Sequence, residues 1–566
     1  MDSEKKPPAS GLKTLYAVSL AAASGILSAM AFAPFGFTGL VWVSLIPWLY
    51  CLPRLTLIQT LVCYITFASG YFLIGLFFLT SVHPLAPLAL LLPLLVMCLP
   101  FPLLYRWVVR ELKLPAILVA PVIWVATDYF RMFLFTGCPW LYLGYTQAFY
   151  PALIQIADIT GTYGVTFLIV MVNGSVLDWF EWYLATGAAR PKVRRLLAGT
   201  ASVVLLLVAT LVYGQWRLQT ISYVTGPRIA CVQGNIPQDI KDDPRENRQR
   251  ILEAYTTLSV KAMEQKPELL VWPETMAPYD LKLDFSTLAM FRDLVKLSGT
   301  HLLIGSHHYD FDDQAKLVKS YNSAYFLNPA GEFLDRYDKM KLMILGEYTP
   351  KIPVVHTIVR KLAGYVSGLS SGERATVFQL GQYRFGTPIC LEIIYPAIAR
   401  TFAREGCDFI INLTNEGWFF DTSEQEQILA IAVFRAVENR IGVLRAGNTG
   451  ITLNIAPDGR LRKEQILTIP HAQYFASLPP FMQVRLAGRR LPGWDVAFGG
   501  ERLKWKDFPG IFCQAVPLAT GPRSWYTRYG DLFAQIVSAI ALLWCAIIGK
   551  EAYVQRCRQA DRTKSQ

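Results

Sequence analysis

The chain has 566 residues, of which 53% are hydrophobic and 17% are charged, and its formal net charge is +12. This composition argues against an ordinary soluble enzyme, which is less apolar, and against a protein embedded throughout in a membrane, which carries fewer charges. It predicts a hybrid of membrane-spanning helices and a water-exposed domain. The positive charge does not indicate a nucleic-acid partner, because Lys and Arg lie in short gaps between apolar runs and form no basic stripe with interleaved aromatic residues.

The ten cysteines and six histidines form no metal-binding pattern. No two cysteines fall in a paired ligand spacing, and the adjacent His307 and His308 would point to opposite faces of a strand. We therefore expect no metal and no organic cofactor. Five of the cysteines lie in or beside apolar runs, namely Cys51, Cys63, Cys98, Cys138 and Cys545.

A polar N-terminal tail precedes an apolar run from about Leu15 to Ala33. A cleavable signal peptide is the alternative, but the run is long for a signal core and further apolar segments follow at once, which favours a retained helix. Each apolar run is long enough, or nearly so, to cross a hydrocarbon core, which gives about eight spans. Residues 136–162 are apolar enough to be re-entrant or interfacial. The other spans are predicted at 38–53, 56–81, 86–109, 114–132, 163–184, 196–215 and 531–549.

Lys and Arg are distributed unequally between the loops that join these spans. Positive loops remain in the cytoplasm, so an N-terminus in the cytoplasm accounts for the pattern. Seven crossings then deliver the chain at about Tyr223 to the opposite face. The basic loops lie at 54, 106–113, 190–195 and 550–566, whereas 33–38, 81–86 and 136–162 contain no Lys or Arg.

Residues from about 228 to 479 have soluble character and alternate between strand-like and helical patterns. Such alternation is typical of an α/β domain whose sheet is covered by helices. The strand-like stretches are 228–235, 268–272, 301–306, 407–413 and 442–455, and the helical stretches are 243–265, 284–297 and 423–438.

These patterns predict the domain boundaries. The segment between the α/β domain and the last span is basic and aromatic, and it is either a solvated loop or a surface that rests on anionic lipid headgroups. The predicted parts are 1–222 for the first seven spans, 228–479 for the α/β domain, 480–530 for the connecting segment, 531–549 for the last span and 550–566 for a cytoplasmic tail.

Three chemically active side chains follow strand-like runs of the α/β domain. Glu274 follows a Pro that cannot continue a central ladder, Lys339 follows a strand, and Cys390 follows a Gly and a Pro at a sharp turn. Together they could form an acyl-transfer centre in which the carboxylate removes the thiol proton and the thiolate attacks a carbonyl. The ammonium and a backbone N–H such as that of Leu391 would hold the oxyanion.

Taken singly, each of these residues has an ordinary structural interpretation. A Cys between apolar neighbours is typical of a small buried hydrophobe, Glu274 is equally typical of a strand-end surface charge, and Lys339 of a solvated loop. Spacing alone leaves their convergence open.

The three stretches belong to longer motifs, which are Val271-Trp272-Pro273-Glu274, Tyr337-Asp338-Lys339, Gly346-Glu347-Tyr348-Thr349-Pro350, Ile389-Cys390-Leu391-Glu392, Gln233-Gly234-Asn235-Ile236-Pro237-Gln238, Thr136-Gly137-Cys138-Pro139-Trp140 and residues 412–418. They resemble the motifs of the nitrilase superfamily, and with the membrane segments around them they resemble the apolipoprotein N-acyltransferase family. The resemblance runs through nearly the whole chain.

The resemblance implies a membrane helical bundle joined to a nitrilase-like αββα sandwich. It implies that Cys390 is the nucleophile, Glu274 the general base and Lys339 the oxyanion-stabilising cation, with Glu347, Glu392 and Leu391 in supporting positions.

The implied reaction has two steps. An acyl chain passes from a phospholipid, such as phosphatidylethanolamine, to the Cys as a thioester, and then to the α-amino group of the diacylglyceryl-cysteine of an apolipoprotein. The implied protein is a monomer in the bacterial cytoplasmic (inner) membrane, with its catalytic domain on the periplasmic face.

Departures from the family pattern leave the three central residues intact. Leu391 stands where a Tyr is usual, Asp242 or Asp243 where a Trp is expected, Glu416 where an Asp is usual and Phe420 where a Gly is common. These changes concern the lipid pocket. Two other functions stay open. One is a membrane-tethered amidase that hydrolyses its thioester with water, and the other is a non-catalytic lipid carrier. The retained base, cation and thiol argue against the carrier.

Two further features carry hypotheses. The apolar run 342–345 beside Lys339 either lines the acyl entrance or packs in the core. Asp128 and Arg131, three residues apart within a predicted span, either pair with each other or meet a lipid headgroup.

Overall fold

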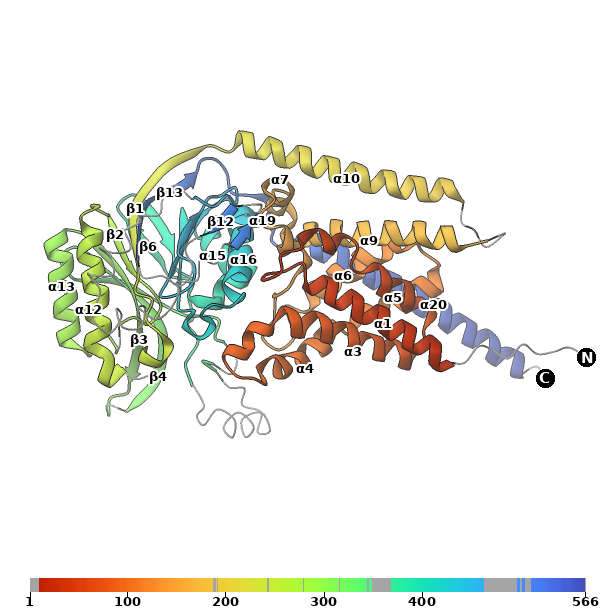
Figure 1. Ribbon diagram of the computed structural model, residues 1–566, viewed down its shortest axis with the longest axis horizontal. Helices are drawn as coiled ribbons and strands as arrows, with labels where there is room; N and C mark the ends of the chain where they lie inside the picture. The colour runs from red at the N-terminus through yellow and green to blue at the C-terminus, as the bar shows by residue number, and fades with distance from the viewer. Residues whose placement is uncertain are drawn as a thin grey trace, which may run out of the picture. The chain divides into compact units, whose positions relative to one another are not determined.

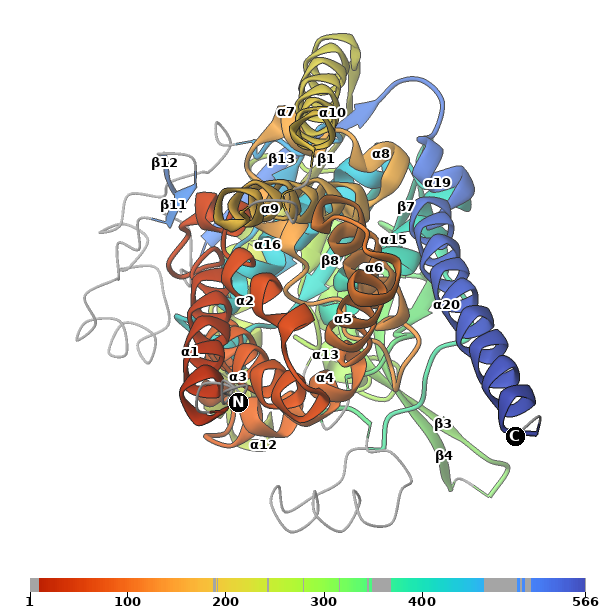
Figure 2. The same cartoon turned by 90° about the vertical axis from the view of Figure 1, so that its right-hand side faces the viewer.

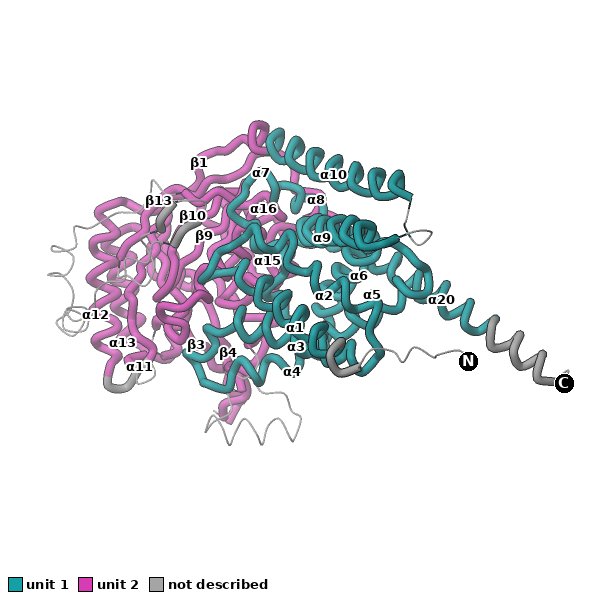
Figure 3. The backbone as a smooth tube through the Cα atoms, turned by 45° about the vertical axis from the view of Figure 1, so that its right-hand side comes forward, with its two compact units in different colours: residues 1–217, 531–566 teal, residues 218–530 magenta. Residues whose placement is uncertain are grey.

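The structure is a computed structural model, and it describes residues 10–186, 190, 192–241, 244–277, 279–314, 316–343, 346–348, 368–462, 496–498, 501–503 and 510–564. The chain forms two compact units, coloured separately in Figure 3. We call residues 1–217 with 531–566 the helical unit, and residues 218–530 the sheet unit.

The helical unit is a bundle of apolar helices (Figure 1). Among the described residues, five helices are long and apolar enough to cross a membrane, namely Leu57–Gly75, Ala86–Leu112, Thr162–Leu184, Val193–Thr220 and Leu532–Val554. The helices of this unit are α1 (Ser10–Ala29), α2 (Ile46–Cys51), α3 (Leu57–Gly75), α4 (Ala86–Cys98), α5 (Pro100–Leu112), α6 (Ala116–Phe130), α7 (Pro151–Ile154), α8 (Ala157–Thr160), α9 (Thr162–Leu184), α10 (Val193–Thr220) and α20 (Leu532–Lys564).

The outward surfaces of these helices are apolar. Leu205 on α10 is 68% exposed and Leu542 on α20 is 70% exposed, and Figure 2 shows both helices at the periphery of the bundle. Helices that are hydrophobic all round suit a lipid environment. Inside the bundle, Gly25 lets α1 approach α3 closely, since a Cβ at that position would lie 2.3 Å from the carbonyl oxygen of Phe67.

The predicted span over 38–53 does not form one helix. The chain there makes a 3₁₀ turn, Thr38–Trp42, then the short helix α2 and a second 3₁₀ turn, Leu52–Arg54. Pro47 stands in the first turn of α2 and Pro53 in the last 3₁₀ turn. A Pro lacks the N–H that a continuous helix needs, so the apolar run is interrupted at both positions.

The pairing of Asp128 with Arg131 is confirmed, with 3.7 Å between the guanidinium and the carboxylate. Arg131 also donates to the carbonyl oxygen of Trp140 at 2.5 Å and lies over the ring of Tyr142 at 4.6 Å. These contacts fasten part of the predicted re-entrant segment 136–162 to α6. Because the guanidinium also has carbonyl and aromatic partners, its charge is distributed over several contacts within an apolar bundle.

The sheet unit contains two sheets packed face to face between helices (Figure 1). The first sheet has the order β13-β1-β2-β3-β4-β5 and the second β10-β9-β8-β7-β6. The strands are β1 (Tyr223–Gln233), β2 (Leu269–Trp272), β3 (His301–Phe311), β4 (Leu317–Leu327), β5 (Phe333–Asp338), β6 (Val377–Leu380), β7 (Tyr383–Gly386), β8 (Phe409–Thr414), β9 (Gly442–Gly447), β10 (Leu453–Ile455) and β13 (Gly510–Ala519), with a separate pair, β11 (Val496–Phe498) and β12 (Glu501–Leu503).

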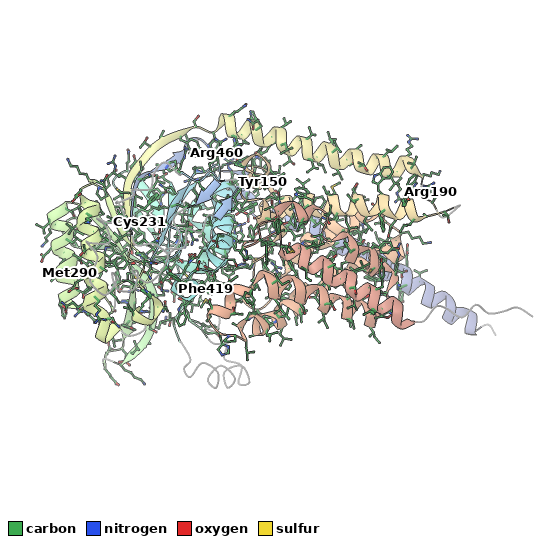
Figure 4. The ribbon with its side chains drawn as sticks, in the orientation of Figure 1. Tyr150, Arg190, Cys231, Met290, Phe419 and Arg460 are labelled. Carbon is green, nitrogen blue, oxygen red and sulfur yellow. The ribbon has the colours of Figure 1, made fainter. Side chains whose placement is uncertain are left out.

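Helices cover the outer face of each sheet. Tyr255 on α12 and Phe291 on α13 pack with Trp272 of β2 in one buried core. The predicted αββα sandwich is thereby confirmed. Cys231, labelled in Figure 4, lies on β1 and is fully buried. The helices of this unit are α11 (Gln238–Lys241), α12 (Pro244–Met263), α13 (Phe285–Ser298), α15 (Pro396–Arg404), α16 (Glu424–Asn439) and α19 (Trp525–Tyr529).

Alternation along β3 and β4 sorts their side chains between the two faces of the first sheet. The pair Ile304 and Tyr325 belongs to the core under α12 and α13. Phe326, one residue further along β4, contacts Phe378 and Phe385 of the second sheet. Because successive strand residues point to opposite faces, every second residue of β3 and β4 faces the second sheet.

Residues 510–519, which lie in the predicted connecting segment 480–530, form β13. This strand pairs antiparallel with β1 at the edge of the first sheet. Most of the rest of the basic part of that segment, including 480–495 and 504–509, lies outside the described residues.

Candidate active site

Glu274 and Cys390 follow the carboxyl ends of strands with parallel partners, where sites of α/β proteins are typically built, and Lys339 follows β5, which pairs antiparallel with β4. Glu274 comes two residues after β2, and Cys390 follows β7, which runs parallel to β8. Lys339 is the first residue after β5. The ends of strands from both sheets therefore supply the candidate site.

Glu274 is held in a turn that presses closely against β3. A Cβ on Gly305 would lie 2.3 Å from the carbonyl oxygen of Pro273 and 2.6 Å from the Cα of Glu274, so only Gly fits at this position. Glu274 is 7% exposed. Its Oε2 accepts a hydrogen bond of 2.9 Å from the backbone N–H of Asn415. These contacts fix the carboxylate before any substrate binds.

Cys390 begins a 3₁₀ turn, Cys390–Ile394, in a left-handed backbone conformation with φ of 53°. Such a conformation costs a non-Gly residue roughly 1–2 kcal/mol and occurs preferentially at functional sites. The Asn412 side chain holds the turn by donating to the carbonyl oxygens of Pro388 at 3.0 Å and Cys390 at 3.1 Å. The thiol is free of any disulfide and is hydrogen-bonded to the side chain of Thr414.

Lys339 is 1% exposed and lies between two carboxylates. Its Nζ is 2.8 Å from Oε1 of Glu347 and 3.4 Å from Oε1 of Glu274. A buried ammonium is stable only with such partners. The Asn322 side chain on β4 completes the cluster, because its Nδ2 donates to Glu274 and to Glu347, each at 2.8 Å.

The charges of this cluster stabilise one another. Burial works against the charged form of Lys339, but the carboxylates of Glu347 and Glu274 outweigh it and hold the pKa of the ammonium well above its usual range. Burial likewise disfavours ionisation of Glu347, yet Lys339 and three hydrogen bonds lower the pKa of that carboxyl. Glu347 and Lys339 therefore remain an ion pair at neutral pH.

The Cys390 thiol is protonated in the resting site. Burial raises the pKa of the thiol above its usual range, the carboxylates of Glu274 and Glu347 raise it further, and Lys339 and Thr414 lower it only in part. The thiol thus needs a base when it reacts.

Glu392 lies beneath the site, fully buried, and ties two loops together. Its Oε1 accepts from the backbone N–H groups of Met340 and Lys341 at 2.7 and 2.9 Å. Its Oε2 accepts from the backbone N–H of Ile389 at 2.7 Å and from the hydroxyl of Tyr337 at 2.8 Å. Burial raises the pKa of Glu392 to about 7, although hydrogen bonds from these donors act to lower it. The carboxylate joins the loop after Lys339 to the turn that carries Cys390.

The structure therefore brings together Glu274, Lys339, Cys390 and Glu347, with Glu392 behind them. Leu391 follows Cys390 in the same turn and is partly exposed. Of the apolar run 342–345, only Leu342 and Met343 lie within the described residues. The backbone N–H of Met343 donates to Oε2 of Glu347 at 3.0 Å.

Sequence reasoning missed Asn322 and Thr414. A signal for Asn322 exists, because Asn is depleted in strands and this one lies in a stretch, 321–327, whose other residues except Ser323 are apolar or aromatic. What it contacts depends on Glu274 and Glu347, which come from distant parts of the chain. Thr414 ends β8 and lies within the motif at 412–418, but nothing in that motif marks it as a partner of Cys390.

A buried carboxylate, an ammonium and a thiol in electrostatic contact provide a base, a cation and a nucleophile for carbonyl chemistry. Comparison with known proteins places the chain in a family. The carbon-nitrogen hydrolase family matches residues 228–466, and the apolipoprotein N-acyltransferase N-terminal domain family matches residues 24–175. The apolipoprotein N-acyltransferase of Geobacter metallireducens is 32% identical over 542 residues, which cover 93% of this chain and 94% of that protein.

The chain belongs to the apolipoprotein N-acyltransferase family. The apolipoprotein N-acyltransferase of Methylococcus capsulatus is 30% identical over 88% of this chain and 94% of that protein. Among solved structures, an amidase from Nesterenkonia sp. aligns with a TM-score of 0.33 and 16% identity, over 56% of this chain and 95% of that chain, and at this score the alignment supports no conclusion. The family predicted from the motifs is confirmed, and with it an acyltransferase with a nitrilase-type domain.

Proposed function

We propose that this protein transfers a fatty acyl chain from a phospholipid, through a thioester on Cys390, to the N-terminal amino group of an apolipoprotein. The observation that carries the proposal is the buried cluster of Glu274, Lys339 and Cys390, in a chain of the apolipoprotein N-acyltransferase family. Family membership supports the substrates, and the geometry supports the roles.

In the first step Glu274 takes the proton of the Cys390 thiol as the sulfur attacks the ester carbonyl of the phospholipid. The carbonyl oxygen becomes an oxyanion, which the Lys339 ammonium stabilises. When the tetrahedral intermediate collapses, the ester C–O bond breaks. The leaving alkoxide takes the proton from Glu274, so that a lysophospholipid departs and the thioester remains.

In the second step the amino group of the acceptor attacks the thioester carbonyl. A C–N bond forms, the C–S bond breaks, and Glu274 receives a proton from the amine. That proton returns to the sulfur of Cys390, which restores the resting thiol. The product is an amide, and no atom is gained or lost by the enzyme.

The membrane supplies both substrates. Phospholipid donors and diacylglyceryl acceptors keep their acyl chains in a bilayer, and the apolar helices of this chain support embedding in the same bilayer. We assign the protein to the bacterial inner membrane as a monomer, with the sheet unit on the periplasmic face, because the basic loops then remain in the cytoplasm.

Turnover with a defined acceptor tests the proposal. Purified protein in detergent is incubated with phosphatidylethanolamine and a peptide that begins with diacylglyceryl-cysteine. The peptide should gain one acyl group at its N-terminus by mass spectrometry, and Cys390→Ala should abolish the gain. Release of free fatty acid with an unmodified peptide would contradict the proposal, since it would indicate an amidase-like enzyme that gives its thioester to water.

A further inference from the structure

Two buried polar atoms beside the active site have no hydrogen-bond partner among the described residues. They are Oδ1 of Asn322 and Nδ1 of His307. The two residues are direct partners in the antiparallel pairing of β3 and β4. Direct partners point to the same face of a sheet, with Cβ atoms about 4.5–5.5 Å apart. This is the face that carries Phe326 toward the second sheet, and Asn322 reaches Glu274 and Glu347 from it.

The chemistry of Asn322 fixes which way its amide is turned. Its Nδ2 donates to Glu274 and to Glu347, each at 2.8 Å. Ionised carboxylates can only accept hydrogen bonds, so the amide nitrogen must face them. The unpartnered Oδ1 is therefore an acceptor that needs a donor.

The ring of His307 is fixed in the same way. One ring nitrogen donates to the backbone carbonyl of Tyr321, and since Nδ1 has no partner this nitrogen is Nε2. Burial lowers the pKa of His307, so the ring is neutral at physiological pH. In this tautomer Nδ1 carries a lone pair and no proton. His307 also lies close enough to Lys241, Glu274 and Glu347 for all three charges to act on its ring.

A site that offers two unpaired acceptors fits a ligand with several N–H donors. A primary ammonium has three such donors. An ester or a thioester has none, and the ionised phosphate of a donor lipid has none either. The amino group of the acceptor is the group in the proposed reaction that matches.

We propose that His307 Nδ1 and Asn322 Oδ1 bind the acceptor's α-amino group and aim its nitrogen at the acyl thioester on Cys390. This inference rests on the proposed function and adds where the amine is held. The ammonium form binds first and releases one proton to water. The neutral amine then forms the C–N bond as the C–S bond breaks, and its second proton passes from nitrogen through Glu274 to sulfur.

Single-turnover kinetics separates the contribution of His307 from that of the catalytic residues. Full-length wild type, His307→Phe and His307→Gln are acylated with phosphatidylethanolamine in detergent, and the rate of thioester formation is measured without acceptor. Loss of the thioester is then followed in water alone and at several concentrations of a diacylglyceryl-cysteine peptide. His301→Phe is the matched control, because His301 lies on the same face of β3 and stacks on Phe326.

In His307→Phe we expect aminolysis to slow about tenfold or more through a higher apparent KM for the peptide. The reason is that one N–H of the amine loses the ring nitrogen that accepts its hydrogen bond. Thioester formation and hydrolysis should stay within about threefold of wild type. His307→Gln, which offers an amide oxygen, should recover part of the loss, and His301→Phe should behave as wild type.

Three results would overturn the inference. Unchanged aminolysis in His307→Phe would show that the amine is held elsewhere. Hydrolysis and aminolysis that fall together would show that the two acceptors hold water, and a parallel fall of acylation would show a structural role. If wild type itself forms no thioester, the proposed function fails instead, so the two failures are distinguishable.

Discussion

At the scale of single residues, the Cys390 thiol is surrounded by two carboxylates and one ammonium. Burial and both carboxylates raise the pKa of the thiol, and Lys339 offsets only part of that increase. The free enzyme should therefore contain little thiolate at neutral pH. Its reactivity must come from proton transfer to Glu274 during attack, and not from a preformed thiolate.

The first prediction concerns the pH dependence of alkylation. A raised pKa means less thiolate at any given pH, so modification of Cys390 by iodoacetamide should keep rising above pH of about 8.5, the midpoint of an unperturbed thiol. In Glu274→Gln the carboxylate that raises the pKa of the thiol most is lost, so the profile should move to lower pH although acyl transfer is lost. A wild-type midpoint below that of a free thiol, measured by peptide mass spectrometry, would contradict this account.

The second prediction concerns Glu392, whose two oxygens accept four hydrogen bonds. In Glu392→Gln one oxygen is replaced by an NH₂ that faces donors, which leaves buried groups unpaired at about 1–3 kcal/mol each. We expect the thermal midpoint in detergent to fall and acylation of Cys390 to slow at least about tenfold. Glu405→Gln, on the surface, is the control, and unchanged acylation in Glu392→Gln would remove the anchoring role.

At the scale of elements, β3 shapes the turn that holds Glu274. The third prediction is that Gly305→Ala displaces this turn, because the new Cβ would meet three backbone atoms, the nearest at 2.3 Å. A shift of about 1 Å in a catalytic group can cost about 100-fold in rate, so acylation should fall by that order. Gly549→Ala, where nothing lies within 4 Å, is the control. A Gly305→Ala enzyme that acylates at the wild-type rate would contradict the assigned contact.

Most elements of the sheet unit could be predicted because their patterns are local. The apolar run before Glu274 became β2, and the helical pattern over 284–297 became α13 at Phe285–Ser298. The interruption of the span at 38–53 could not be predicted from hydropathy. An apolar run has the same hydropathy whether it forms one helix or several short turns around prolines. The strand β13 depends on pairing with β1, almost 300 residues earlier in the chain.

The candidate site also has a part that could be predicted from the sequence and a part that could not. Glu274, Lys339 and Cys390 stand in motifs that can be read along the chain, so the residue types could be named. Their convergence could not, because it depends on how two sheets face each other. His307 illustrates the limit, since its unpaired nitrogen is a property of the folded site alone.

At the scale of the whole molecule, the chain combines a bundle that suits lipid with an α/β unit that carries the candidate site. The fourth prediction concerns the orientation of that unit. Glu373, whose side chain is 87% exposed, lies in the sheet unit, and the exposed Thr186 follows α9 beside the basic stretch 190–195. With native cysteines monitored in parallel, Glu373→Cys should react with a membrane-impermeant maleimide in intact spheroplasts.

Thr186→Cys should react only after the membrane is permeabilised, because positive loops remain in the cytoplasm. The reversed labelling pattern would contradict a periplasmic sheet unit. Equal labelling of both positions before permeabilisation would instead indicate leaky spheroplasts, which a cytoplasmic marker enzyme released into the medium would reveal.

The most direct test of the central claim is the mass of the Cys390 peptide after the purified protein has met phosphatidylethanolamine in detergent with no acceptor. We predict one fatty acyl group on Cys390, removed by hydroxylamine as expected for a thioester. It should be absent from Cys390→Ala and from Glu274→Gln. A folded protein whose Cys390 stays unmodified while lipid is present would contradict the acyl-enzyme mechanism.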